Sequence, residues 1–77
     1  MIFVSRNSNT AKEVVNEATK FINENKENIL KINGNNYHPL PFIIEMKNND
    51  KYLFMTNKYF NDNWKLGREL GKDYKLF

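Results

Sequence analysis

Apolar side chains recur at spacings of three and four residues between positions 11 and 22, which predicts an amphipathic helix. The apolar stripe consists of Ala11, Val14, Val15, Ala18, Phe21 and Ile22. Thr10 and Glu13 match the capping box, in which a hydroxyl and a carboxylate satisfy backbone N–H groups at the helix start. The polar run 23–28 is expected to end the helix.

Short apolar runs on either side of this helix predict strands. Residues 2–5 are mostly apolar and partly β-branched, which suits a strand. Residues 29–32 lead into Asn33-Gly34, a pair that supplies the positive φ values of a tight turn. A strand is therefore expected directly before and directly after the helix.

A hairpin is predicted from residues 42–47 and 50–56, with Asn48-Asn49 as a two-residue turn. In that register Ile44 faces Leu53, so one face carries an apolar set that is expected to lie against the helix. This set is Phe42, Ile44, Met46, Leu53 and Met55. The opposite face is then mixed and aromatic, with Ile43, Glu45, Tyr52 and Phe54.

The last third of the chain predicts a second helix. Asn61 or Asp62 can cap it, and if it continues towards Lys75, then Leu66 and Leu70 lie on one side of it. The whole pattern predicts an α+β protein with the order β-α-β-β-β-α, an antiparallel sheet and the first helix packed on one face. At 77 residues the chain is too short for two cores, so residues 1–77 are expected to form a single domain.

So small a domain buries only about 60% of the surface of its unfolded chain, which makes self-association a useful source of stability. A strand edge near residues 2–4 and the mixed aromatic face are hard to cover, so we expect a homo-oligomer. The apolar runs are far too short to span a membrane, and the N-terminus does not resemble a signal peptide. These features predict a cytoplasmic protein with no membrane partner.

Side chains that carry catalysis are scarce. The chain has no cysteine, and its only histidine, His38, has no Asp, Glu, Ser or Cys within four residues. A catalytic triad needs an orienting carboxylate and an activated nucleophile, which the sequence does not identify. The carboxylates lack the spacing of a calcium or zinc site, and the three glycines form neither a P-loop nor a dinucleotide fingerprint. We therefore expect a protein that is not an enzyme and holds neither a metal nor a cofactor.

Positive charge is concentrated in the last third of the chain. Residues 1–50 contain six basic and six acidic side chains, whereas residues 51–77 contain six basic and three acidic, so the second segment accounts for the net charge of +3. In a helical projection Trp64 lies on the basic arc, opposite Leu66 and Leu70. The predicted partner-binding residues are Tyr59, Trp64, Lys65, Arg68 and Lys72.

Two functions fit this surface. Desolvated Trp and Arg side chains anchor protein interfaces, which favours a protein-binding module. Basic residues among aromatic ones also bind single-stranded nucleic acid, which is the alternative function. A third interpretation places Tyr59 and Phe60 in the core and leaves the lysines merely solvated. The fourteen asparagines and ten lysines indicate a low-GC genome, which favours a phage or mobile-element factor that inhibits or modulates a host macromolecular machine.

Overall fold

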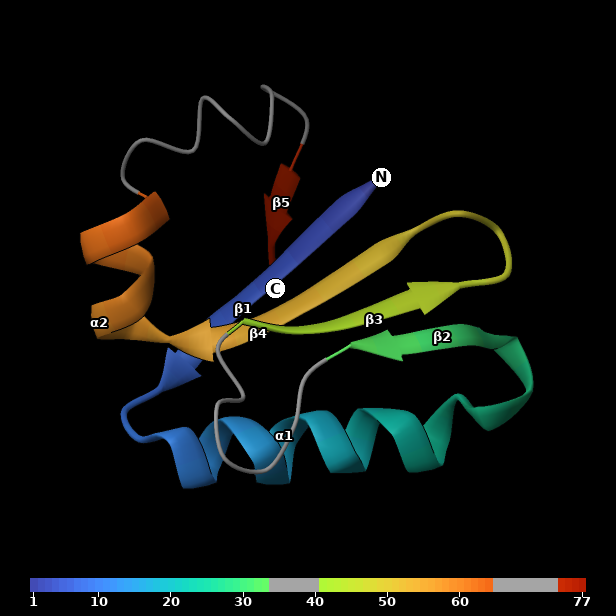
Figure 1. Cartoon of the computed structure of the whole chain (residues 1–77), viewed down its shortest axis with the longest axis horizontal. Helices are drawn as coiled ribbons and strands as arrows, with labels where there is room; N and C mark the ends of the chain where they lie inside the picture. The colour runs from blue at the N-terminus through green and yellow to red at the C-terminus, as the bar shows by residue number, and fades with distance from the viewer. Residues whose placement is uncertain (34–40, 65–73) are drawn as a thin grey trace.

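The computed structural model describes residues 1–33, 41–64 and 74–77, which form a mixed sheet with a long helix on one face (Figure 1). In chain order the elements are β1 (Ile2–Ser8), α1 (Ala11–Glu24), the 3-10 turn η1 (Lys26–Asn28), β2 (Ile29–Asn33), β3 (Phe42–Met46), β4 (Lys51–Thr56), α2 (Asn57–Tyr59), the π-helical turn η2 (Phe60–Trp64) and β5 (Tyr74–Leu76). The strands lie in the order β2-β3-β4-β1-β5.

The sheet combines an antiparallel meander with parallel pairs. β2, β3 and β4 form the meander, while β1 is parallel to both β4 and β5. α1 runs opposite to β1, and β2 turns back again, so β2 has the direction of β1; two further reversals, at β3 and at β4, give β4 the direction of β1 as well (Figure 1). The α+β class and the packing of the first helix on the sheet are confirmed. The prediction of an antiparallel sheet is wrong for β1 and β5, because these strands pair in parallel.

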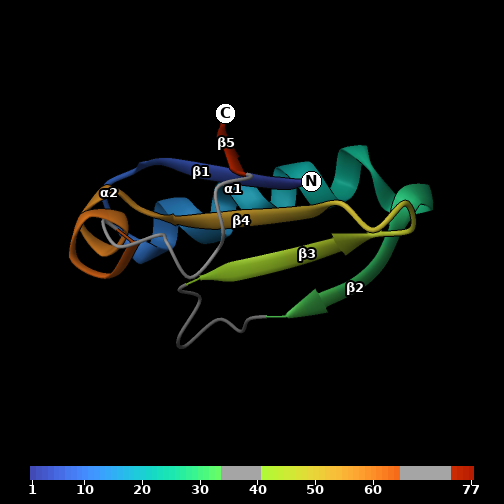
Figure 2. The ribbon, with the colours of Figure 1, turned by 90° about the horizontal axis from the view of Figure 1, so that it is seen from above.

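β1 lies inside the sheet, between β4 and β5 (Figure 2). The strand edge expected near residues 2–4 therefore does not exist, because both sides of β1 are paired. Within the described part of the chain the two outer strands are β2 and β5. Among the described strands, only β2 and β5 therefore have one edge that no other strand pairs with.

α1 forms where the apolar stripe predicted it. The Thr10 hydroxyl accepts a hydrogen bond from the Glu13 N–H and donates one to the Glu13 carboxylate, each at 3.2 Å. The carboxylate thus orients the capping hydroxyl in place of reaching back to a backbone N–H. At the other end the Asn25 side chain donates to the Phe21 carbonyl at 2.8 Å, and the helix ends within the predicted polar run.

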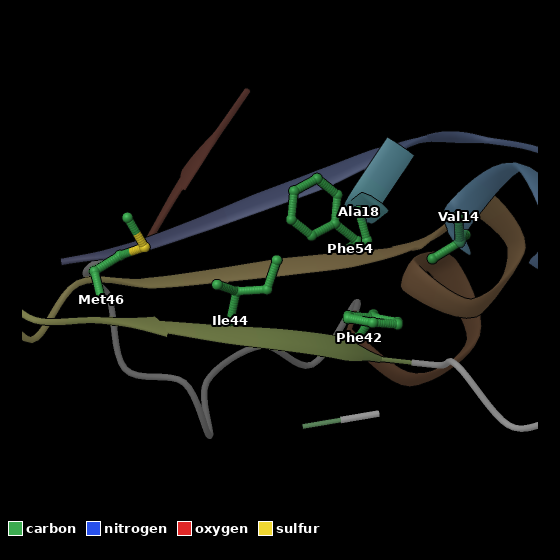
Figure 3. Packing of buried hydrophobic residues seen from close by; sticks show 6 residues of the cluster. All are labelled: Val14, Ala18, Phe42, Ile44, Met46 and Phe54. Carbon is green, nitrogen blue, oxygen red and sulfur yellow. The ribbon is translucent and has the colours of Figure 1, made fainter. Parts of the chain in front are cut away.

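Two hydrophobic clusters lie on the two faces of the sheet. The cluster under α1 consists of Val14, Ala18, Phe42, Ile44, Met46 and Phe54 (Figure 3). Val14 and Ala18 are fully buried, which confirms the inner face of the helix. The second cluster consists of Val4, Leu53 and Met55. The central strands are therefore buried on both sides, which is why β4 contains consecutive apolar residues.

The β3–β4 hairpin differs from the predicted one by one residue in register. The Asn49 N–H donates to the Met46 carbonyl at 3.0 Å, and the Met46 N–H donates to the Asp50 carbonyl at 2.8 Å. These bonds define a three-residue loop that ends in Asn49, whose φ of 75° is left-handed. The expected two-residue turn at Asn48-Asn49 does not form.

This shift exchanges the two faces of β4, because successive side chains of a strand point in opposite directions. Phe54 pairs with Phe42 and, like Tyr52, faces α1. Leu53 and Met55, which were expected beside α1, lie on the other face. The predicted mixed, aromatic outer face is therefore absent from the described sheet.

Asn49→Ala is expected to lower the free energy of unfolding by about 1 kcal/mol, whereas Asn49→Gly should leave it nearly unchanged. A left-handed residue with a Cβ atom costs roughly 1 to 2 kcal/mol, which glycine avoids and asparagine reduces through local hydrogen bonds. Urea unfolding of the two variants measures the difference. Equal stability of the alanine and glycine variants would contradict the left-handed turn.

The second helix begins earlier than expected. The Thr56 hydroxyl accepts a hydrogen bond from the Tyr59 N–H at 3.0 Å and caps α2 directly after β4, upstream of the predicted caps Asn61 and Asp62. Residues 65–73, the middle of the predicted helix, lie outside the described residues. Residues 74–76 form β5, so the helix prediction is wrong there, because pairing with a strand at the start of the chain overrides the local pattern.

Candidate functional site

The predicted partner-binding residues are only partly within the described chain. Tyr59 of α2 is half-buried and packs, with Phe60, against the cluster on the sheet face opposite α1. This contact agrees with the interpretation of both aromatic residues as part of the core. Trp64 is the last residue of η2. Three predicted residues lie outside the described part: Lys65, Arg68 and Lys72.

Arg6 of β1 reaches the same part of the molecule, which no local pattern in the sequence indicated. Its guanidinium carbon lies 4.9 Å from the centre of the Phe60 ring, and its Nη1 donates to the Asn57 side chain at 2.9 Å. Its Nε is buried without a hydrogen-bond partner. Stacking of a guanidinium on an aromatic face contributes about 0.5 to 2 kcal/mol. Arg6 therefore links β1 to α2 and η2 and adds a positive charge beside their aromatic residues.

Lys58 of α2 has its charge paired. Its Nζ lies 2.7 Å from the Asp62 carboxylate, one helical turn further on. The hydrogen bond to this carboxylate and its negative charge raise the pKa of Lys58 above the usual value. Both side chains are exposed, so the pair contributes little to stability. A paired lysine attracts phosphate less strongly, which weakens the case for nucleic acid at this point.

Glu17 of α1 accepts hydrogen bonds from two serine hydroxyls of β1. Ser5 Oγ lies 2.6 Å from one carboxylate oxygen and Ser8 Oγ lies 3.0 Å from the other. Strand alternation would place these serines on opposite faces, but the pairing of β1 with β4 shifts register between them, and both reach the helix. Nucleophilic catalysis needs an accessible hydroxyl, and Ser5 is only 1% exposed. The three side chains therefore link α1 to β1.

Three hollows that described residues line are smaller than a typical small-molecule site. No group of three or more histidine or carboxylate side chains in residues 1–33, 41–64 and 74–77 could hold a metal ion. Hollows beside η1, beside the hairpin loop and between α1 and Phe77 measure about 290, 200 and 200 Å³. Typical small-molecule sites measure about 300 to 1,000 Å³. No described helix is long and apolar enough to cross a membrane.

The outer strand β2 exposes large apolar side chains. Leu30 is 66% exposed and Ile32 is 43% exposed. α1 packs mainly on β4, with smaller contacts to β1 and β3; Ile29 at the start of β2 packs against the cluster under α1, while Leu30 and Ile32 stay exposed. The sequence predicted a strand here, but its position in the sheet, and hence its exposure, depends on the pairing of distant segments.

The other outer strand, β5, also exposes apolar side chains. Leu76 is 50% exposed and the following Phe77 is 45% exposed, next to an exposed Lys75. Phe77 is held in place, because its N–H donates to the Val4 carbonyl at 3.0 Å and its ring meets the Tyr52 ring edge-on at 5.4 Å. We refer to the sheet edge formed by Lys75, Leu76 and Phe77 as the β5 surface. Phe77 lies on its α1 side, with Tyr52 and Phe54, and Leu76 lies on the opposite side, next to Val4.

The β5 surface adjoins the segment that the sequence singled out. Tyr74, at the start of β5, contacts Phe60 of η2, with ring centres 6.5 Å apart. Tyr59 and Trp64 belong to the same α2–η2 segment as Phe60. The structure thus brings β5 beside the α2–η2 segment, to which two of the predicted partner-binding residues belong.

No protein-family model matches the chain, and comparisons with curated proteins and with solved structures find no match. The function proposed for the chain therefore rests on its own geometry.

Proposed function

We propose that this protein is a small, non-enzymatic binding protein that acts through direct contact with another protein at the β5 surface. The proposal depends on one observation. Leu76 and Phe77 remain 50% and 45% exposed on an outer strand, although Phe77 is fixed by a backbone hydrogen bond. Fully burying such a side chain contributes about 1.5 to 3 kcal/mol, so a partner that covers the two gains a substantial part of its affinity there.

The partner is expected to present an apolar patch bordered by acidic residues. Lys75 lies in the β5 surface, and Arg6 lies beside Phe60, whose ring contacts Tyr74 at the start of β5. Basic residues at the rim of an interface raise the association rate and select a partner of opposite charge. The low-GC composition supports the proposal that the partner is a component of a host machine, which a phage or mobile-element factor inhibits or modulates in the cytoplasm.

Leu76→Asp is expected to weaken partner binding at least about tenfold while leaving the fold intact. A desolvated anchor residue contributes about 2 kcal/mol or more to an interface, and a half-exposed leucine contributes less to folding. The tagged protein first captures a partner from a host lysate, and dissociation constants are then measured with the purified partner. Thr19→Asp is the matched control, because it adds the same charge at an exposed position of α1.

Trp64→Ala extends this test to the segment predicted from the sequence, and it is also expected to weaken binding about tenfold.

Titration with single- and double-stranded oligonucleotides across a salt series tests the alternative function. Tight binding that weakens steeply with salt would replace the protein-partner proposal, because phosphate contacts release counterions. Equal partner binding by wild type and Leu76→Asp would exclude the β5 surface as the contact.

A further inference from the structure

The direction of the backbone groups in β3 follows from the hairpin. The Met46 N–H donates to the Asp50 carbonyl at 2.8 Å, so the backbone groups of Met46 face β4. Successive residues of an antiparallel strand direct these groups to alternate sides. The N–H and C=O groups of Glu45 and Ile43 therefore face β2.

The same alternation identifies the outward groups of β2. The partners of Glu45 and Ile43 are Lys31 and Asn33, which therefore direct their backbone groups towards β3. Ile32 lies between them, so its N–H and C=O point away from the sheet. No strand among the described residues pairs with this edge. Ile32 thus presents one donor and one acceptor beside its 43% exposed side chain.

We propose that two copies of this chain pair in antiparallel orientation through β2, with Ile32 of one copy opposite Ile32 of the other. In this register each Ile32 N–H donates to the C=O of the other Ile32. The outward backbone N–H and C=O of Ile32 are therefore both hydrogen-bonded to the same residue of the second copy. Both Ile32 side chains then lie next to each other on the α1 side of the sheet, where Ile44 is the neighbour of Ile32. Their contact removes apolar surface from water.

The charges of β2 favour this register. Lys31 then faces Asn33 of the second copy, whereas a pairing centred on Lys31 would place two lysines opposite each other. Asn33 donates to the Glu45 carboxylate at 3.4 Å, so each Lys31 approaches the Glu45 carboxylate of the other copy, which also forms an ion pair with Lys51 at 3.8 Å. Among the described residues Lys31 itself forms no ion pair.

The other occupant of such an edge is a strand of a different protein. A lysine and a bulge on an outer strand discourage edge-to-edge pairing with any strand that opposes them unfavourably, and β2 has Lys31 and a register shift between Ile29 and Lys31. The twofold register at Ile32 avoids the like-charge contact of a self-pairing centred on Lys31 and places Lys31 opposite Asn33. β2 and β5 are the two ends of the strand order, so this inference does not depend on the proposed function of the β5 surface.

Sedimentation equilibrium of the purified chain over a concentration series is expected to give a mass that rises towards twice 9.2 kDa. Ile32→Pro removes the outward N–H while keeping the bonds to β3, because proline is tolerated where the N–H of an outer strand faces solvent. This variant is expected to keep the circular dichroism spectrum of the wild type and to sediment as a monomer. The proposal is overturned if the wild-type chain stays monomeric at every soluble concentration. If Ile32→Pro in addition fails to capture the partner, the β2 edge pairs with a strand of a different protein.

Cysteine cross-linking tests the register itself, and it remains informative if Ile32→Pro fails to fold. The chain has no cysteine, so Ile32→Cys introduces its sole thiol. Opposed residues of a hydrogen-bonded antiparallel pair have Cα atoms about 5.5 Å apart, within the roughly 4.4 to 6.8 Å that a disulfide spans. Leu30→Cys is the matched control. Leu30 is more exposed than Ile32, but in the proposed register the two Leu30 residues are offset by four residues along the paired strands, or about 13 Å. Mild oxidation should give a disulfide-linked dimer of Ile32→Cys and none of Leu30→Cys. Any other result overturns the register.

Discussion

Phe54→Ala is expected to lower the free energy of unfolding by about 3 to 5 kcal/mol. Phe54 is 1% exposed, and its ring contacts those of Phe21 and Phe77, with centres 5.5 and 5.6 Å away. A domain of this length has a stability of roughly 4 to 12 kcal/mol, so the substitution removes a large part of it. Urea unfolding followed by circular dichroism measures the change.

Two further variants separate this effect from a general sensitivity to substitution. Phe54→Leu fills most of the buried volume and should cost less than Phe54→Ala, because the cavity term is smaller. Lys12→Ala changes an exposed residue of α1 and should alter the stability by less than about 0.5 kcal/mol. An unchanged unfolding curve for Phe54→Ala would contradict the hairpin register, which places this ring under α1.

The first helix was predictable because its signals are local. The spacing of Val14, Ala18, Phe21 and Ile22 and the cap at Thr10 all act within one segment, and the structure confirms them. Local signals also predicted β2 and the two strands of the hairpin. These elements require no knowledge of where distant parts of the chain lie.

The hairpin register was not predictable from the pattern, because β4 is apolar on both faces. Leu53, Phe54 and Met55 are consecutive and all buried, so neither register leaves a charged side chain in the core. The loop length decided the register, and Asn49 could adopt the left-handed conformation in a two-residue or a three-residue loop. The strand at 74–76 was missed for a different reason: it forms by pairing with β1, at the other end of the sequence.

The exposed surfaces depend on the same long-range arrangement. Leu30 and Ile32 are apolar residues of the kind found in buried strands. Their side chains are exposed because β2 is an outer strand of the sheet. The predicted second helix ran towards Lys75, whereas residues 74–76 form the outer strand β5, on which Leu76 is exposed. The aromatic residues Tyr59, Phe60 and Trp64 were visible in the sequence, but the proximity of Phe60 to Arg6 and Tyr74 was not.

The two proposals together describe a bivalent protein. β2 and β5 lie at opposite ends of the strand order, so pairing through β2 leaves one β5 surface at each end of the joined sheet. A partner that repeats its site at the matching distance would bind the second copy at a raised effective concentration. Such linkage increases avidity by about 10²- to 10⁴-fold without any new contact.

Glu17→Met is expected to lower the free energy of unfolding by about 2 to 4 kcal/mol. Ser5 and Ser8 are 1% and 5% exposed, and Glu17 accepts a hydrogen bond from each of them. The substitution removes this acceptor from two buried hydroxyls, and a buried polar group left unsatisfied costs about 1 to 3 kcal/mol. Methionine keeps the unbranched apolar stem of the side chain, so the change isolates the carboxylate. Urea unfolding measures the loss.

The control for Glu17→Met removes the donors as well as the acceptor. Replacing both partners of a buried hydrogen bond by apolar groups can be nearly neutral, because no polar group then stays buried without a partner. The triple variant with Ser5→Ala, Ser8→Ala and Glu17→Met should therefore regain most of the stability that Glu17→Met alone loses. This strongly non-additive result is expected of side chains in one hydrogen-bond network. If the triple variant is less stable than Glu17→Met, the serines stabilise the fold independently of the carboxylate, and the contact is not what holds β1 against α1.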